Sequence, residues 1–178
     1  GRKKYPYCIV EGVRSCAEYF AAVPEMAFFT VANSAELVKN TGACGDVRIV
    51  PETVFSRISG TMHSQGILVV SKIPAEPSAD EFNKDDFVLA LDKVGDPGNF
   101  GTICRTAKAA GLTELWYTKG SVDPFSDKVI RSAMTAQFMM KLRCFETLSD
   151  LRDEAVRQGF CNVCLSKPGK GQSCFVAE

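Results

Sequence analysis

The stretch Leu89–Gly111, LALDKVGDPGNFGTICRTAKAAG, predicts a short buried strand, a glycine-rich turn and a helix. Its first three residues end an apolar run, which is typical of a buried strand. Asp92–Gly98 contains two glycines and one proline, so we expect a turn there and a helix that begins near Asn99. Gly111 should end this helix, because glycine takes the left-handed C′ conformation without a steric penalty.

Arg105 is the candidate functional side chain of this helix. A strand, a turn and a helix N-terminus in this order bring free backbone N–H groups and the positive end of the helix dipole together, which suits an anionic or ribose-bearing ligand. Arg105 lies opposite the apolar stripe and should lean back over Gly101 toward the turn. A solvated surface arginine without a function explains the same spacing.

A dinucleotide-binding turn is the competing interpretation of these glycines. Gly95, Gly98 and Gly101 are spaced G-x-x-G-x-x-G, whereas the dinucleotide fingerprint requires G-x-G-x-x-G. The next expected strand, near Leu115 to Tyr117, ends on no acidic residue that would hold a ribose. The mismatch argues against a nicotinamide or flavin dinucleotide.

Composition limits the class of protein. The 178 residues are 46% hydrophobic, which fits one globular domain or two small ones. The formal net charge is zero, so nucleic-acid binding would depend on local patches. No apolar run approaches the ~18 residues of a membrane span, and the start lacks a secretory apolar region. We expect an intracellular, cytoplasmic protein, with an organellar location left open.

The eight cysteines favour a reduced protein with buried thiols. Cys8 falls in an expected strand, and Cys16 and Cys104 fall on apolar helix stripes. Cys161-x-x-Cys164 has the spacing of half a zinc site, but in the strand expected at Phe160–Leu165 the two would face opposite sides. A structural zinc needs four ligands and no second pair exists, so we expect no metal.

Strands alternate with helices in the first part, which predicts an α/β fold. We expect a domain at residues 1–73, a linker at residues 74–84 that is poor in apolar side chains, and a second domain at residues 85–178. The strands expected in the first domain are Tyr7–Val10, Met26–Val31, Val47–Val50 and Gly66–Ser71. Three helices should connect them, the second of them capped by Ser34 and the third opened by Pro51.

Two more helices are expected after the strand Glu114–Tyr117. The first is capped by Ser126 or Asp127, and Lys128, Arg131 and Thr135 should share one of its faces. An ordinary solvated face explains these basic residues equally well. The second helix should begin at a capping signal, Thr147-x-x-Asp150, and end at Gly159.

The pattern Asn99-x-Gly101-x-x-x-Arg105, preceded by Asp96-Pro97-Gly98, resembles the first motif of the SpoU family. These TrmH-like proteins of the SPOUT superfamily are RNA ribose 2′-O-methyltransferases. The resemblance implies an α/β RNA-binding domain followed by a trefoil-knot α/β domain, S-adenosylmethionine as cofactor and a homodimer. It implies that Arg105 is the catalytic residue and that Asn99 lies at the active site.

The first part of the chain resembles the substrate-binding domain of the same family. The matching pieces are Val10–Val13, Ser59–Thr61 and Gln65–Leu68. The resemblance implies that the residues contacting RNA are Arg14, Ser59, Gly60, Thr61 and Gln65, together with the basic Lys128 and Arg131. Near these basic residues, Ala133 and Thr135 stand where the family usually has Ser and Gly. An ordinary turn explains Ser59–Thr61 equally well.

Two further motifs of the family, a Gly- and Glu-containing turn and a Ser-Leu-Asn run, do not occur before Glu178. In the family they complete the knot and most of the cofactor pocket, so the cofactor-binding residues stay unknown. We expect a methyltransferase that modifies rRNA or tRNA as a whole protein, and no activity from these 178 residues alone. A non-catalytic RNA-binding or ribosome-associated module is the alternative.

Overall fold

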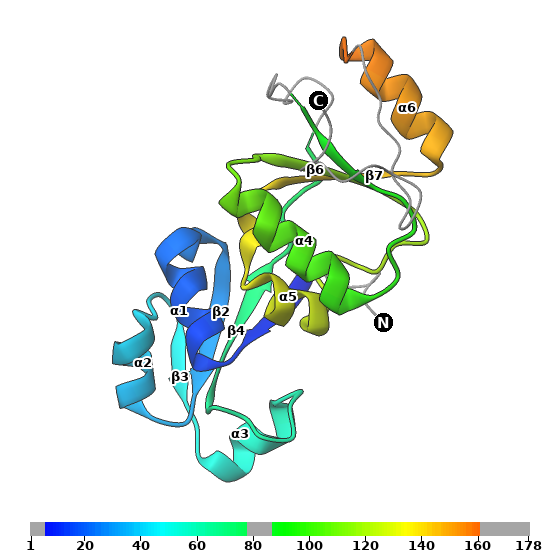
Figure 1. Cartoon of the computed structure of the whole chain (residues 1–178). Helices are drawn as coiled ribbons and strands as arrows, with labels where there is room; N and C mark the ends of the chain where they lie inside the picture. The colour runs from blue at the N-terminus through cyan, green and yellow to red at the C-terminus, as the bar shows by residue number, and fades with distance from the viewer. Residues whose placement is uncertain (1–5, 78–86, 161–178) are drawn as a thin grey trace, which may run out of the picture.

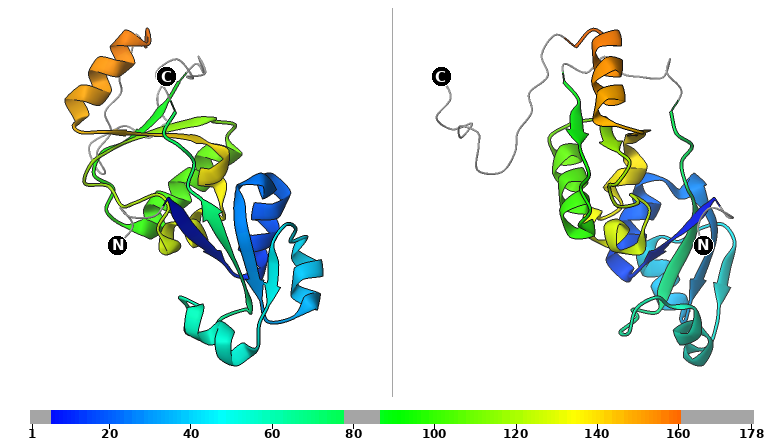
Figure 2. Two further views of the ribbon diagram at one scale, coloured as in Figure 1. Left: turned by 180° about the vertical axis from the view of Figure 1, so that it is seen from behind. Right: turned by 90° about the vertical axis from the view of Figure 1, so that its right-hand side faces the viewer.

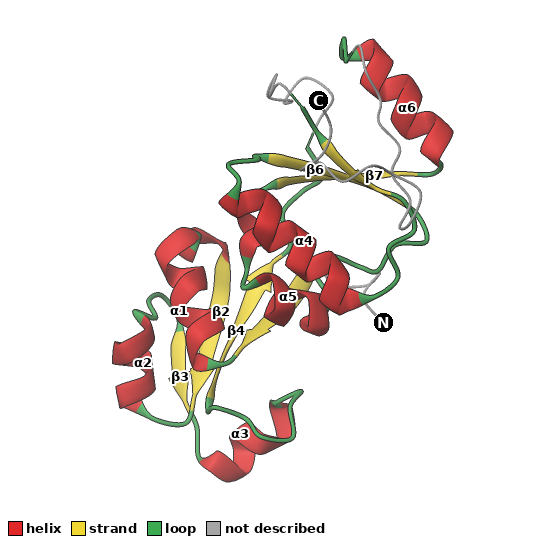
Figure 3. Cartoon of the chain, viewed as in Figure 1, coloured by secondary structure: helices red, strands yellow, loops and turns green. Residues whose placement is uncertain are grey.

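The computed structural model describes residues 6–77 and 87–160, in which two sheets and their helices form a mixed α/β fold (Figures 1 and 3). The elements of the first part are β1 (Tyr7–Glu11), α1 (Val13–Ala22), η2 (Pro24–Met26), β2 (Ala27–Ala32), α2 (Ala35–Thr41), β3 (Val47–Ile49), α3 (Glu52–Ile58) and β4 (Ile67–Lys72). Those of the second are β5 (Leu89–Leu91), α4 (Pro97–Ala109), β6 (Glu114–Thr118), α5 (Asp127–Ala133), η3 (Ala136–Met139), β7 (Lys141–Phe145) and α6 (Leu148–Arg157).

The first sheet is mixed and has the strand order β1-β4-β2-β3. β4 runs antiparallel to both β1 and β2, whereas β2 and β3 are parallel. Alternation along each strand sends one set of apolar side chains toward α1 and α2, and the other set toward Phe55 of α3. The four strands expected here are confirmed, with ends that differ by one residue or not at all.

The second sheet is parallel, with the order β5-β6-β7. Helices cover both of its faces, as parallel sheets require (Figure 2). Leu91, Leu115 and Leu142 pack under α4 and α5 on one face, while Trp116 and Phe145 pack against α6 on the other.

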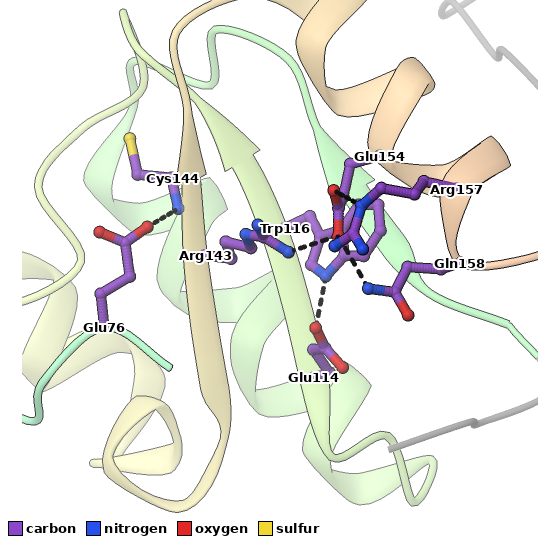
Figure 4. Close-up of polar contacts among 8 residues, drawn as sticks. All are labelled: Glu76, Glu114, Trp116, Arg143, Cys144, Glu154, Arg157 and Gln158. Carbon is purple, nitrogen blue, oxygen red and sulfur yellow. Dashed lines mark hydrogen bonds and ion pairs between the residues drawn. The ribbon is translucent and has the colours of Figure 1, made fainter. Parts of the chain in front are cut away.

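An ion-pair cluster fixes α6 against β7 (Figure 4). Glu154 Oε1 accepts hydrogen bonds from Arg143 of β7 at 2.8 Å, from Arg157 at 2.6 Å and from Gln158 at 2.8 Å. These bonds outweigh the effect of burial and lower the pKa of Glu154 from 4.5 to about 2, with the bond from Arg157 as the largest cause. Glu154 is therefore ionised over the whole ordinary pH range.

The two parts of the chain share a core. Ile130 of α5 and Phe138 of η3 are buried in the same cluster as Tyr19 and Phe20 of α1. The rings of Tyr19 and Phe138 meet edge to face, with centroids 5.5 Å apart. α5 thus packs on the first sheet as well as on α4. The domain boundaries expected at residues 73 and 85 stay a prediction.

Three features of the secondary structure differ from what was expected. The helix after β5 begins at Pro97, not near Asn99, because Asp96 is its N-cap and Pro97 takes the first helical position. The strand β7 was not expected, although charged and apolar residues alternate along Lys141–Cys144 as in a half-buried strand. Thr135 is not on an exposed helix face: α5 ends at Ala133, and Thr135 is buried in a left-handed turn with φ 64°.

The expectations about the buried cysteines and the helix caps are confirmed. Cys8, Cys16 and Cys104 are buried, and burial raises the pKa of Cys16 and of Cys104 to about 12. Ser34 caps α2, and Thr147 and Asp150 form a capping box. No helix in the described ranges has the length and apolarity to span a membrane. The strand expected beyond Phe160 and the Cys161/Cys164 pair lie outside the described residues.

Candidate functional site

The N-terminus of α4 is held in place from within the motif. Asp96 Oδ1 accepts a hydrogen bond from the backbone N–H of Asn99 at 2.7 Å, and the carbonyl of Asp96 accepts one from Phe100 at 3.0 Å. Pro97 needs no hydrogen-bond partner for its nitrogen at this position. Asp96 and Pro97, which directly precede the motif residues, therefore define the start of the helix after β5.

Gly101 lies where α4 and α5 approach each other closely. A Cβ atom on Gly101 would lie 1.8 Å from Ser132 Oγ and 2.7 Å from the backbone nitrogen of Ala133. Ser132 Oγ also donates a hydrogen bond to the carbonyl oxygen of Pro97 at 2.9 Å. Gly101 is buried, and its missing side chain is what lets α5 approach.

Asn99 and Arg105 are both exposed on α4. The residues between and beside them that face the core are Phe100, Cys104 and Ala107. The structure thus places the two candidate catalytic side chains on the solvent side of a helix whose other sides are buried against the sheet and α5. Such an arrangement fits a site that receives a large external substrate.

Glu11, which the sequence did not single out, organises the loop that carries the predicted RNA-binding residues. Its carboxylate accepts hydrogen bonds from Ser59 Oγ at 2.5 Å, from Gly60 N at 3.1 Å and from Thr61 Oγ1 at 2.8 Å. Burial raises the pKa of Glu11, but these bonds and one from Ser64 outweigh burial and leave the pKa below its usual value. Glu11 therefore acts as a buried carboxylate anchor at the end of β1.

Gln65 holds the other end of this loop. Its Oε1 atom accepts a hydrogen bond from Val13 N at 2.8 Å, which caps the first turn of α1 from a residue far along the chain. Gly12 makes this approach possible, since it has φ 101° and a Cβ there would lie 2.9 Å from the amide oxygen of Gln65. Arg14 is exposed on the same first turn of α1.

The loop also lies against α5. A Cβ on Gly60 would lie 3.8 Å from Asp127 Oδ2, at the first residue of α5. Lys128 is exposed and Arg131 is half-buried on that helix. The structure therefore brings the predicted RNA-binding residues of both parts of the chain to neighbouring positions. No pattern in the sequence reveals Glu11 as their anchor, because its partners are about fifty positions away.

A cavity of about 340 Å³ lies at the start of β7, lined by Glu76, Tyr117, Phe125, Met140 and Leu142 among others. Ligands of open parallel sheets bind beyond the carboxyl ends of the strands, which is the end where Asn99 follows β5. In the described ranges, no group of three His, Cys, Asp or Glu side chains is arranged to hold a metal ion.

Comparison with known families gives one match that covers half the chain. The model of the SpoU rRNA Methylase family matches residues 86–177. The Bacillus subtilis 23S rRNA (guanosine(2553)-2'-O)-methyltransferase RlmP is 39% identical over 90 residues, covering 51% of this chain and 35% of its own length. The rRNA methyltransferase 3, mitochondrial, of Mus musculus is 32% identical over 153 residues, covering 79% of this chain and 36% of its own.

Solved structures agree with this match. A putative RNA methyltransferase of the TrmH family from Porphyromonas gingivalis superposes with a TM-score of 0.74 at 30% identity, over 89% of this chain and 62% of that one. An rRNA methyltransferase from Sinorhizobium meliloti solved with AdoMet bound has a TM-score of 0.67 at 26% identity, over 88% and 59%. The chain spans only 35% to 40% of the length of three curated relatives.

Proposed function

Because this chain belongs to the SpoU rRNA methylase family, we propose that the whole protein transfers a methyl group from S-adenosylmethionine to a ribose 2′-hydroxyl of structured rRNA or tRNA. The observation that carries this proposal is the motif helix α4. Gly101 of this helix is buried against Ser132, while Asn99 and Arg105 stay exposed. The relative whose name specifies a 2′-O-methyltransferase supports the reaction type, and the AdoMet-bound neighbour supports the cofactor.

Arg105 has the chemistry that this reaction requires. A ribose 2′-hydroxyl is a weak nucleophile, so its oxygen needs stabilisation as its proton leaves. A guanidinium stays protonated at neutral pH and offers a planar fork of donors. Arg105 would hold a phosphate of the RNA and stabilise negative charge on the 2′-oxygen, while another group accepts the proton. Asn99, six residues earlier on the same helix, would orient the ribose.

S-adenosylmethionine supplies the electrophilic methyl group when it is bound. We assign it to no described residue. The proposal also includes the parts that the resemblance implies: an RNA-binding domain at residues 1–73, a methyltransferase domain from residue 85, a homodimer, and an intracellular location.

Methyl transfer from radiolabelled S-adenosylmethionine to rRNA and tRNA, measured with the whole protein, tests the proposal. Arg105→Ala should lower the rate by about 10²–10³. Arg152→Ala on α6 is the matched control, since Arg152 is also exposed and pairs only with its neighbour Asp153 among the contacts described. A wild-type protein without methyl transfer would leave the non-catalytic RNA-binding module as the better interpretation.

A further inference from the structure

The loop between α3 and β4 uses its polar groups internally. Ser59 Oγ, Gly60 N and Thr61 Oγ1 all donate to Glu11, and Thr61 N donates to Ser59 Oγ at 3.1 Å. Near the other end, Gly66 N donates to Ser64 Oγ at 3.2 Å, and the side chain of Gln65 caps α1. Donors already engaged with a carboxylate have little capacity left for a phosphate. Ser59, Gly60 and Thr61 were predicted to contact RNA, but their hydrogen bonds to Glu11 are better explained as holding the loop in place.

Met62 and His63 are what this braced loop presents to solvent. The side chain of Met62 is 97% exposed, the most exposed of the large apolar residues in the described ranges, and His63 is exposed beside it. A long apolar side chain and an aromatic ring are thus exposed at adjacent positions of the loop. Both ends of the loop are hydrogen-bonded to the first sheet or to α1, so the tip is held in a defined place.

The surrounding charges indicate which part of a nucleic acid fits the tip. Glu11 and Asp127 place two carboxylates next to Gly60, so a phosphate at the turn itself would be repelled. Exposed cations flank the loop: Arg57 lies in the last turn of α3, two residues before Ser59, Lys128 follows Asp127 on α5, and Arg14 lies on the first turn of α1. Phosphates would therefore lie to the sides of the loop, and an uncharged base would meet the tip.

We propose that Met62 and His63 contact unpaired bases of the RNA, and that Glu11 is the positioning residue that holds them there. The inference rests on the proposed RNA substrate and names the part of the chain that recognises it. Unpaired bases stack on aromatic side chains such as His, and their exposed faces offer apolar surface to a side chain such as Met. A fully paired helix shields its base faces and offers the tip no such contact.

Fluorescence anisotropy with the 178-residue chain tests the tip. The two probes are a labelled RNA stem–loop with an unpaired loop and a blunt RNA duplex of the same length. The double variant Met62→Ala/His63→Ala should bind the stem–loop about tenfold more weakly and the duplex unchanged, because a stacked base contributes ~1–3 kcal/mol. Its melting temperature should not change, since both side chains are exposed. Unchanged affinity for the stem–loop overturns the proposal.

Val156→Ala supplies the matched control. Val156 is an apolar side chain that is 63% exposed on α6, at the opposite end of the molecule from α3 (Figures 1 and 2). This variant should bind both RNAs as the wild-type chain does. An equal loss with Val156→Ala would show that exposed apolar surface in general, and not the loop tip, causes the binding.

A double-mutant cycle tests the positioning role of Glu11. Glu11→Gln replaces one acceptor of the carboxylate by a donor that faces the donors of the loop, and so should weaken stem–loop binding. In the Met62→Ala/His63→Ala background the same change should add almost nothing, because no tip is left to position. Full additivity would show that Glu11 acts independently of the tip and would overturn its assignment.

Kinetics of the whole protein separate this inference from the proposed function. The tip variant should raise the KM for RNA and leave kcat unchanged, since the tip is not among the reacting groups. A wild-type KM in the tip variant overturns the inference while the methyltransferase proposal stands. A wild-type protein that binds the stem–loop through its tip but transfers no methyl group supports the inference and overturns the proposed reaction.

Discussion

Gly101 and Ser132 lie so close that a β-carbon on Gly101 would be 1.8 Å from Ser132 Oγ. This contact joins the helix that carries Asn99 and Arg105 to the helix that carries Lys128 and Arg131. α5 in turn packs on the first sheet through Ile130. One glycine therefore lets a single helix contact both the candidate active site and the candidate RNA-binding part of the chain.

Gly101→Ala should reduce the free energy of unfolding by about 1–3 kcal/mol, the usual cost of overpacking a core. The backbone nitrogen of Ala133, only 2.7 Å from the new carbon, cannot move aside as a side chain does. Urea denaturation measures the effect. Gly95→Ala is the control, because nothing lies within 4 Å of a Cβ at Gly95. Equal stability of the two variants would contradict the close contact between α4 and α5.

Thr135 has φ 64°, a left-handed conformation that costs a β-branched residue about 1–2 kcal/mol. Thr135→Gly removes that strain together with the side chain, whereas Thr135→Ala removes the side chain and keeps most of the strain. We expect the Gly variant to be more stable than the Ala variant by about 1 kcal/mol in thermal or chemical denaturation. An Ala variant that equals or exceeds the Gly variant would show that the turn is not left-handed.

Glu154 should make stability depend on pH at the acidic end. Its pKa is about 2 in the folded protein and 4.5 as the reference value. The ion pairs therefore contribute fully above about pH 4.5, and their contribution is lost as the pH falls toward 2. Glu154→Gln should cost about 1–3 kcal/mol at pH 7 and progressively less below pH 4.5.

Asp153→Asn is the control for this pH dependence. Asp153 lies on the same helix, but its side chain is 65% exposed and its ion pair with Arg152 is at the surface. Surface pairs contribute about 0–1 kcal/mol, so this variant should follow the wild-type curve. A Glu154→Gln variant whose deficit stays constant down to pH 2.5 would show that packing, and not the charge of Glu154, stabilises α6.

Sequence signals that act within a few residues were sufficient to predict helix ends. Gly111, Ser34 and the Thr147–Asp150 pair mark helix ends through contacts that span at most four positions. Asp96 and Pro97 carry the same kind of signal, but both residues also favour turns, and the helix start was placed too late.

Contacts between residues far apart in the chain could not be predicted from the sequence. The contact of Glu11 with the loop at Ser59 spans 48 positions, and the Phe138 ring packs on Tyr19 from the other part of the chain. The strand β7 is only five residues long, and its place in the sheet is set by its parallel partner β6. Charged residues at a strand end, such as Glu11, become interpretable only when the fold shows what they contact.

Arg105→Lys tests whether Arg105 acts through its shape or only through its charge. Lysine keeps the positive charge on a similar flexible stem, but its ammonium group lacks the planar fork that can hold a phosphate and the 2′-oxygen together. Because Arg105 is exposed on α4, neither Arg105→Lys nor Arg105→Ala should change the melting temperature of the chain. We expect Arg105→Lys to lower kcat nearly as much as Arg105→Ala does, about 10²–10³-fold, with little change in the KM for S-adenosylmethionine. Wild-type kcat with lysine would reduce the role of Arg105 to simple charge attraction, and the rate should then fall steeply with added salt.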